Sequence, residues 1–257
     1  MEGKKDLRQF LDARAALYNQ PSFIEKDPIC VPHSFIKKQD IEIAGLFAAI
    51  LAWGNRTTII NNSRKLMAWM DNKPHDFIVH HRETDLKAFV HFAHRTFNAT
   101  DLLCFIAFLR HHYGTHDSLE DAFVPGKQYR GDNVEAALIH FHTYFFSLEH
   151  PERTRKHIAT PERNSACKRL NMYLRWMVRK DGNGVDFGIW GKISPRQLIC
   201  PLDVHVARVA ARLGLLDNIK SNWANALQLT GRLKELNHRD PAVYDYALFG
   251  LGMAERF

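Results

Sequence analysis

Apolar residues recur at intervals of three and four along most of the chain, which is the pattern of helices that pack by one face. The most apolar run begins after Asp40 and is too short to span a bilayer, so we expect it to form a central core helix. We predict an all-α protein with helices over residues 4–19, 40–53, 56–72, 100–114, 133–149 and 204–213, and two more before the C-terminus.

The stretch from Pro201 to Leu215 reads PLDVHVARVAARLGL and combines a short apolar helix with a polar edge. Asp203 follows an extended Pro-Leu dipeptide and falls at the N-cap position, while Gly214 closes the helix. The polar edge, at spacings of three and four, consists of His205, Arg208 and Arg212. A capped core helix with a solvated edge accounts for this pattern, and so does a carboxylate beside a basic stripe that contacts a phosphate-bearing ligand.

A basic helix is predicted within residues 153–180, which carry nine Lys and Arg against one acid, Glu162. Lys168, Arg175 and Arg179 share one face beside the apolar stripe of this helix. A helix that is merely solvated usually mixes charges of both signs. Phosphate contact is therefore the simpler interpretation of this segment.

The net charge is unevenly distributed along the chain. Residues 151–257 carry 18 Lys and Arg against 10 Asp and Glu, whereas residues 1–150 carry 17 against 18, within a total of +7. A basic field on one half is typical of polyanion binding, with nucleic acid the commonest partner, although a generally basic soluble protein also shows it. The 257 residues can form one large or two intimately packed domains, and the hydrophobic content of 46% is ordinary for a globular protein.

The cysteines and histidines do not indicate a metal site. The four cysteines are widely scattered and are typical of buried thiols in a reducing compartment. The middle of the chain is rich in histidine, but only His91 and His94 have a helical ligand spacing, and no nearby carboxylate completes a site. No run has the length of a membrane span, and the N-terminus lacks a signal core. We therefore expect a cytoplasmic protein with no metal, no cofactor and no membrane contact.

The segment LDVHVARVAARLGL resembles the "VDTHV..R...RLGL" segment of the helix-hairpin-helix Gly/Pro-Asp superfamily of DNA glycosylases. The catalytic aspartate of that segment maps to Asp203. The segment ACKRLNMYLRWMV is similar to the corresponding run of the 8-oxoguanine glycosylases, which places the lysine of the lyase reaction at Lys168. Over its whole length the chain more closely resembles a bacterial family of uncharacterised conserved hypothetical proteins, which implies no function.

The glycosylase resemblance implies a two-lobed helical fold with a central cleft. One lobe would span residues 40–189 and include the basic helix with Lys168, and the other would combine residues 1–39 and 190–257 and include Asp203. The implied function is a DNA glycosylase with abasic-site lyase activity, which excises a damaged base such as an oxidised purine from duplex DNA. Lys168 would be the Schiff-base nucleophile and Asp203 the activating carboxylate. No cysteine follows Cys200, so the iron–sulfur cluster of the endonuclease III relatives is not expected, and we expect a monomer.

Two further groups of residues are predicted to contact the DNA. Those expected at the phosphates are Arg163, Arg169, Arg175, Arg179, His205, Arg208 and Arg212. Those expected at the extruded base are Trp53 and Asn55, in the turn WGNRTTI, and Phe187 and Trp190, in the Gly-rich loop 180–200. Ordinary turn chemistry for the first pair and core packing for the second are the alternatives.

The chain departs from the superfamily just before Lys168. The superfamily's Gly-rich hairpin is expected there, but the chain reads ATPERNSACK, without glycine. Pro161, Asn164 and Ser165 can still expose a helix N-terminus to a phosphate. A non-catalytic nucleic-acid-binding module on the same fold is therefore one alternative to the enzyme, and a helical protein-interaction scaffold is another. Only nucleic-acid binding predicts a steep fall in affinity with salt.

Overall fold

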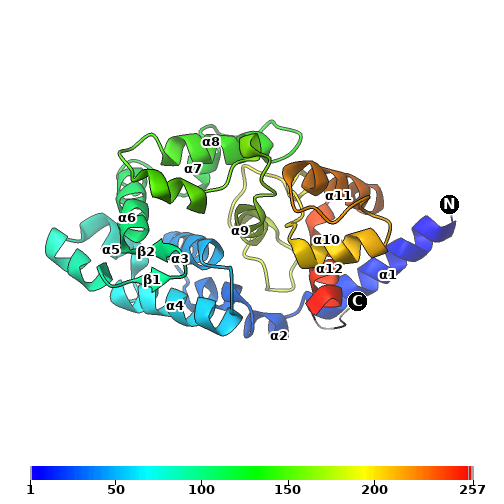
Figure 1. Ribbon diagram of the computed structural model, residues 1–257, viewed down its shortest axis with the longest axis horizontal. Coiled ribbons are helices and arrows are strands. Elements are labelled where there is room, and N and C mark those ends of the chain that lie inside the picture. The colour runs from blue at the N-terminus through cyan, green and yellow to red at the C-terminus, as the bar shows by residue number, and fades with distance from the viewer. Residues whose placement is uncertain (1, 254, 256–257) are drawn as a thin grey trace. The chain divides into compact units, whose positions relative to one another are not determined.

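The computed structural model describes residues 2–253 and 255 and is built almost entirely of helices (Figure 1). Helix accounts for 62% of the structure and strand for 2%, which confirms the all-α prediction. Over the described residues, the only sheet is the antiparallel pair β1 (Ala93–His94) and β2 (Phe97–Asn98), in which Ala93 pairs with Asn98.

The chain forms two compact units that interleave in sequence. Unit 1 consists of Met1–Phe23, Gln128–Ala136 and Thr160–Phe257, and unit 2 of Ile24–Lys127 and Ala137–Ala159. This division differs from the predicted lobes, because residues 160–189 belong with the C-terminal part of the chain. Lys168 and Asp203 therefore lie in the same unit.

Unit 2 is organised around α3 (Lys38–Ile50), whose residues from Ile41 to Ile50 are all buried, as the apolar run predicts. This helix packs against α4 and α5, and α5 packs against α6. The predicted helix from residue 100 begins slightly earlier, because the side chain of Asn98 accepts hydrogen bonds from the backbone of Thr100 and Asp101. Unit 2 also contains α4 (Arg56–Trp69), α5 (Pro74–His80), α6 (Ala99–Tyr113), α7 (Glu120–Phe123) and most of α8 (Glu135–Phe145), with 3-10 turns at Pro28–Cys30, Pro32–Ser34, Glu83–Phe89 and Glu152–His157. The short helix α2 (Pro21–Ile24) lies where the chain passes from unit 1 to unit 2.

The predicted basic helix within residues 153–180 is not continuous. Its first part is a 3-10 turn in unit 2, in which Arg153 pairs with the buried carboxylate of Asp101 at 2.5 Å and Thr154 donates to the same carboxylate. The helix begins only at Lys168, because the intervening segment contains Pro161 and makes short turns.

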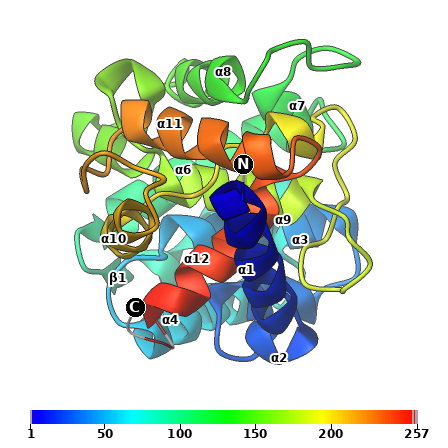
Figure 2. The ribbon, with the colours of Figure 1, turned by 90° about the vertical axis from the view of Figure 1, so that its right-hand side faces the viewer.

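In its described residues, unit 1 contains the helices α1 (Glu2–Tyr18), α9 (Lys168–Val178), α10 (Val204–Arg212), α11 (Trp223–Leu236) and α12 (Tyr244–Met253), with 3-10 turns at Pro161–Arg163, Pro195–Gln197 and Pro241–Val243. Helix α12 packs against both α1 and α10 (Figure 2). The approach to α1 requires Gly250, since a Cβ there would lie 2.1 Å from the ring of Tyr18. Helix α9 is buried from Leu170 to Val178 and supplies the core of this unit.

Candidate active site

The candidate nucleophile Lys168 is the first residue of α9, directly after a tight turn. Asn164 and Cys167 both adopt left-handed backbone conformations in this turn, with φ of 52° and 47°. Asparagine tolerates this conformation, but for cysteine it is uncommon. Cys167 is held by Ser165, whose side-chain oxygen accepts from the Cys167 backbone N–H at 3.2 Å. The turn thus obtains, without glycine, two backbone conformations that glycine usually supplies.

Asp203 is the N-cap of α10, as its position after Pro-Leu predicts. Its Oδ1 accepts hydrogen bonds from the backbone N–H groups of His205 and Val206, both at 2.9 Å. Gly214, with φ of 70°, follows the end of the helix, also as predicted. The capping interpretation is therefore confirmed, and the cap uses only one of the two carboxylate oxygens.

The second oxygen of Asp203 faces Lys168. The distance from Lys168 Nζ to Asp203 Oδ2 is 3.7 Å, and each side chain is 27% exposed. At this distance the two groups form an ion pair, but the separation is longer than the 2.6–3.2 Å at which a proton moves directly between heavy atoms. A small rotation of the lysine side chain, or one bridging water, would connect the two groups.

Asp245 on α12 is a buried carboxyl that is electrostatically coupled to this pair. Its Oδ2 accepts a hydrogen bond from Arg175. Burial raises the pKa of Asp245 to about 6, against the opposing effects of Arg175 and, more weakly, Lys168, while Asp203 raises it further. The ion pair of Lys168 and Asp203 is therefore coupled to a buried carboxyl whose pKa is raised.

Arg175 and Arg179 do not lie on a DNA-contacting face, which corrects the prediction for both. Their side chains are only 4% and 1% exposed. Arg175 pairs with Asp245 and Asp186 and lies over the ring of Tyr246, with 4.2 Å from its guanidinium carbon to the ring centroid. The carboxylate partners of Arg179 are Asp181 at 2.6 Å, Asp186 at 2.5 Å and Asp240 at 2.8 Å. The two arginines share a helix face, as predicted, but that face is covered by loop 180–188 and α12.

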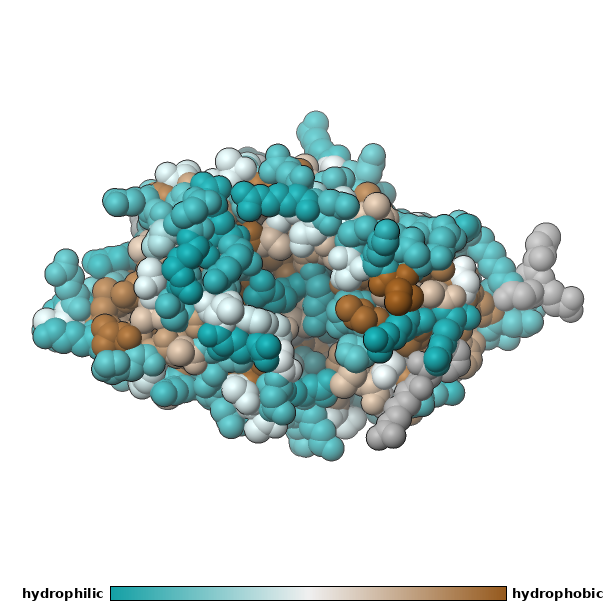
Figure 3. All heavy atoms as spheres, viewed as in Figure 1, coloured by the Kyte–Doolittle hydropathy of each residue, from teal (hydrophilic) through white to brown (hydrophobic). Residues whose placement is uncertain are grey.

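The other predicted phosphate contacts remain accessible to different degrees. Arg163, His205, Arg208 and Arg212 are exposed, whereas Arg169 is partly buried and burial lowers its pKa to about 10. His205, Arg208 and Arg212 follow one edge of α10 from its N-cap Asp203. The neighbouring Val204 is an exposed apolar residue at 47% exposure, and Figure 3 shows apolar surface over α10. A basic edge and an apolar patch therefore both adjoin Asp203.

The predicted base-contacting aromatics of loop 180–200 have different environments. Trp190 is buried at 4% exposure and packs edge to face on Tyr173, with 5.4 Å between ring centroids, so its assignment to a base pocket is corrected to core packing. Phe187 is partly exposed, and its backbone N–H donates to the carbonyl of Trp176 at 2.8 Å. The loop is thus fixed along α9 by its backbone and by its buried tryptophan.

Trp53 and Asn55 lie in unit 2, in the turn between α3 and α4. Asn55 is exposed and caps α4 by accepting from the backbone N–H of Thr58 at 3.1 Å. The guanidinium carbon of Arg95 lies over the partly exposed Trp53 ring, at 4.8 Å from its centroid. The alternative reading of this segment as a helix–turn–helix connection is confirmed.

The described part of the chain contains no cluster of metal-binding side chains, no disulfide and no helix that could span a membrane. Within it, no group of three or more His, Cys, Asp and Glu side chains could hold a metal ion. All four cysteines are free thiols, with Cys30, Cys167 and Cys200 buried and Cys104 partly buried. None of the helices over residues 2–253 is both long enough and apolar enough to cross a membrane.

The sequence interpretation missed the acidic side of the site. Asp186, Asp240 and Asp245 neutralise α9 from a loop and from the C-terminal segment, and none of them was singled out. A signal was present in the helix YDYALFGLG, where one carboxylate stands among apolar and aromatic residues. A buried acid of this kind requires a buried cationic partner.

Comparison with known proteins identifies the family but assigns no activity. No curated protein and no solved structure matches the chain. One family profile, described as a protein of unknown function (DUF2400), matches residues 27–254, which include both Lys168 and Asp203. The chain therefore belongs to the DUF2400 family.

Proposed function

We propose that this protein is a DNA glycosylase with associated abasic-site lyase activity, in which Lys168 is the nucleophile and Asp203 the activating carboxylate. We propose an oxidised purine as the damaged base, because the segments around both residues resemble those of the 8-oxoguanine glycosylases. The expected partner is duplex DNA, and no cofactor is required.

The observation that carries the proposal is the approach of Lys168 to Asp203. The two residues belong to different helices, yet their side chains come within 3.7 Å of each other and both stay partly exposed. The N-cap hydrogen bonds fix the carboxylate through Oδ1, so Oδ2 remains available to the amine. An amine and a carboxylate held in this way are the two groups that a Schiff-base lyase needs.

The chemistry follows from these two groups. Asp203 takes a proton from Lys168, and the neutral Nζ forms a bond to the anomeric carbon C1′ as the bond from C1′ to the base breaks. The base leaves with the bonding electrons and takes up the proton that Asp203 received, which restores the carboxylate. The C1′–O4′ bond then breaks, O4′ takes up the proton that the attached nitrogen loses, and an imine remains between Nζ and C1′. Loss of the C2′ proton finally eliminates the 3′ phosphate. The carboxylate also stabilises positive charge on the sugar while the base departs.

The surface beside the pair supports binding of a polyanion. Arg163 and the basic edge of α10 are exposed, and no described carboxylate pairs with Arg208 or Arg212 within 4.0 Å. Cations of this kind bind phosphates and release counterions, so binding should weaken steeply as salt increases. The apolar Val204 beside Asp203 offers contact to a displaced base or sugar.

Borohydride trapping tests the catalytic proposal. The protein is incubated with duplex oligonucleotides that carry an abasic site or 8-oxoguanine, and borohydride reduces any imine to a stable amine. We expect a covalent adduct with the unaltered protein and with the control Lys180→Gln, which removes an exposed lysine just beyond the opposite end of α9. We expect no adduct with Lys168→Gln and a loss of about a hundredfold or more in trapping rate with Asp203→Asn. Absence of both adduct and base release from the unaltered protein would contradict the proposal.

A non-catalytic nucleic-acid-binding module on the same fold is the second candidate. It is favoured by the cap of α10, because capping explains the presence of Asp203 without any catalytic role. It predicts DNA binding that depends strongly on salt and on Arg208 and Arg212, with no adduct under any condition. A protein-interaction scaffold predicts neither result.

A further inference from the structure

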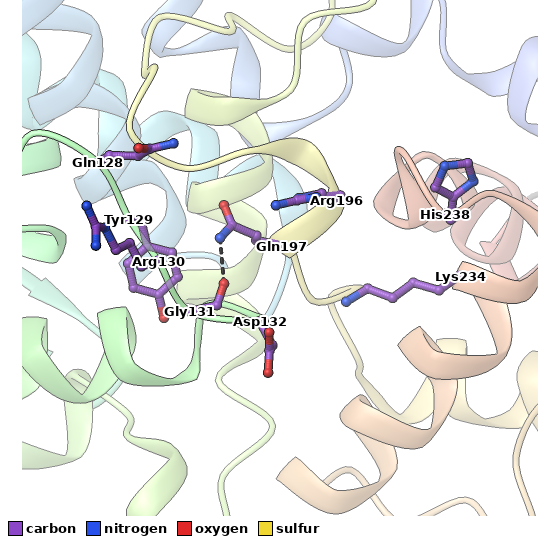
Figure 4. A pocket seen from close by; sticks show the side chains of 9 residues that line it. All are labelled: Gln128, Tyr129, Arg130, Gly131, Asp132, Arg196, Gln197, Lys234 and His238. Atoms are coloured by element: carbon purple, nitrogen blue, oxygen red, sulfur yellow. Dashed lines mark hydrogen bonds between the residues drawn. The ribbon is translucent and has the colours of Figure 1, made fainter.

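Unit 1 contains a polar cavity of about 540 Å³ that involves neither Lys168 nor Asp203. It lies between the segment 128–132, the 3-10 turn Pro195–Gln197 and the C-terminal end of α11. Figure 4 shows Lys234 extending from α11 into the space bounded by Arg196 and Asp132. The volume falls in the range of small-molecule sites.

The wall of this cavity is held by hydrogen bonds between distant segments. The side chain of Gln197 donates to the carbonyl of Gly131 at 2.5 Å and accepts from the backbone of Ser194 at 2.7 Å. The backbone N–H of Val134 in turn donates to the carbonyl of Gln197 at 3.0 Å. Tyr129 is fixed by its hydroxyl, which donates to the carbonyl of Asn133 at 2.6 Å. The backbone of segment 128–134 and the side chains of Tyr129 and Gln197 are therefore held in place, and the exposed Arg130 and Arg196 extend from this wall.

Its charge is strongly asymmetric. Arg130, Arg196 and Lys234 line it against a single carboxylate, Asp132, and His238 also contributes to the lining. None of the three cations forms an ion pair within 4.0 Å with a carboxylate in the described part of the chain. Burial lowers the pKa of Lys234 and Arg196 lowers it further, against the opposing effect of Asp132. Bound anionic oxygens would relieve this repulsion.

We propose that this cavity is a binding site for the phosphate group of a nucleotide. The three cations exceed the one carboxylate by two charges, which matches a phosphate monoester or two adjacent phosphodiesters. Arg130 and Arg196 provide planar donors for phosphate oxygens from opposite sides of Gln197, and Lys234 provides a third cation on the side of Arg196 (Figure 4). The carboxylate of Asp132 can accept from a sugar hydroxyl, and the exposed amide of Gln128 can donate to and accept from a base edge.

The site is distinct from the candidate active site. The chain beside Lys168 meets the N-terminal end of α11, where the backbone of Trp223 donates to the carbonyl of Asn164 at 3.2 Å. Lys234 lies in the last turn of the same helix. At 1.5 Å per residue, the two ends are about 17 Å apart along the helix axis. The nucleotide is therefore either a free ligand or part of a strand that extends well beyond the reacting position.

Binding measurements on the full chain distinguish these two sources. Adenosine triphosphate is titrated by calorimetry, and fluorescently labelled 12-nucleotide single strands and duplexes are titrated by anisotropy, all in 50 mM salt. The variants are Lys234→Gln, Arg196→Gln and, for rescue, Lys234→Arg. The matched control is Arg232→Gln, which removes an exposed cation from the same helix outside the cavity.

We expect at least one probe to bind, with an affinity that falls about tenfold or more in Lys234→Gln and Arg196→Gln, changes less than about twofold in Arg232→Gln and recovers in Lys234→Arg. Binding of adenosine triphosphate would identify a free nucleotide as the ligand, and binding of oligonucleotides alone would identify a strand. The proposal is overturned if no probe binds, or if Arg232→Gln weakens binding as much as Lys234→Gln does.

Discussion

Asp245 provides a direct test of the electrostatics around the Lys168–Asp203 pair. Its pKa is raised from 3.8 to about 6, by burial first and against the opposing effect of Arg175. Between these two values the unfolded chain has already lost the proton that the folded protein still holds. The free energy of unfolding therefore falls as pH rises through this window. The stabilising contribution is complete below about pH 3.8 and lost above about pH 6.

The magnitude follows from the same values. The difference between 3.8 and about 6 corresponds to about 3 kcal/mol, at 1.36 kcal/mol per pH unit. About 2 kcal/mol of this falls between pH 4.5 and pH 7.5, where the measurement is practical. Asp245→Asn removes the titration while it keeps the size and much of the hydrogen bonding of the side chain. The stability of the variant relative to the unaltered protein should therefore rise by about 2 kcal/mol from pH 4.5 to pH 7.5.

Urea unfolding followed by circular dichroism at the two pH values measures this change. Asp217→Asn is the matched control, since Asp217 is an exposed carboxylate of the same unit and should change the relative stability by less than about 0.5 kcal/mol. If the relative stability of Asp245→Asn instead falls between pH 4.5 and pH 7.5, Arg175 outweighs burial and Asp245 is held as a carboxylate. No change would show that Asp245 has the same pKa in both states, and either result refutes the reasoning.

Three further predictions concern the residues around this site. Arg179→Met should destabilise the protein by about 3–5 kcal/mol in urea unfolding, because it removes the cation that pairs with Asp181, Asp186 and Asp240, although Asp186 keeps its contact with Arg175. Arg163→Met at an exposed position should change stability by less than about 0.5 kcal/mol. Asp203→Ala should cost about 1 kcal/mol of stability through loss of the α10 cap, and Asp203→Asn should cost much less, although both should slow trapping by about a hundredfold or more. Equal stability losses in the two variants would argue against the capping geometry. Burial raises the pKa of Cys167 to about 12 and that of Cys200 well above its usual value. Both thiols should therefore react with a disulfide reagent only after unfolding, and rapid labelling of the native protein would contradict this prediction.

Local sequence signals predicted the helices and caps well, because these features depend on residues close together in the chain. The apolar run after Asp40 forms the buried helix α3, and Asp203 and Gly214 bound α10 as expected. The basic segment was predicted less well. Its composition suggested one helix, but the backbone turns at Pro161 and twice adopts left-handed conformations before α9 begins. Hydrophobic periodicity does not register such turns when glycine is absent.

What covers a helix face could not be predicted from the periodicity of that helix. Arg175 and Arg179 share a face, and a single-sign basic face suggested phosphate contact. Their counter-charges come instead from Asp181 and Asp186 in the following loop and from Asp240 and Asp245 near the C-terminus. The pairing of Arg175 with Asp245 joins α9 to α12 within unit 1, which also contains Asp203. The network that removes two predicted DNA contacts is therefore also the one that holds the helix of the candidate nucleophile in place.

The two carboxylate oxygens of Asp203 make different contacts, which explains how a helix cap could also serve a reaction. Serine and asparagine cap a helix about as well as aspartate does, so capping alone does not require a charge at this position. Here Oδ1 satisfies both backbone N–H groups, which fixes the rotamer and directs Oδ2 to a lysine 3.7 Å away. A carboxylate held by two backbone hydrogen bonds needs little reorganisation before it accepts a proton from that amine. The charge of Asp203, and not its ability to cap, is thus the property that distinguishes an enzyme from a binding module.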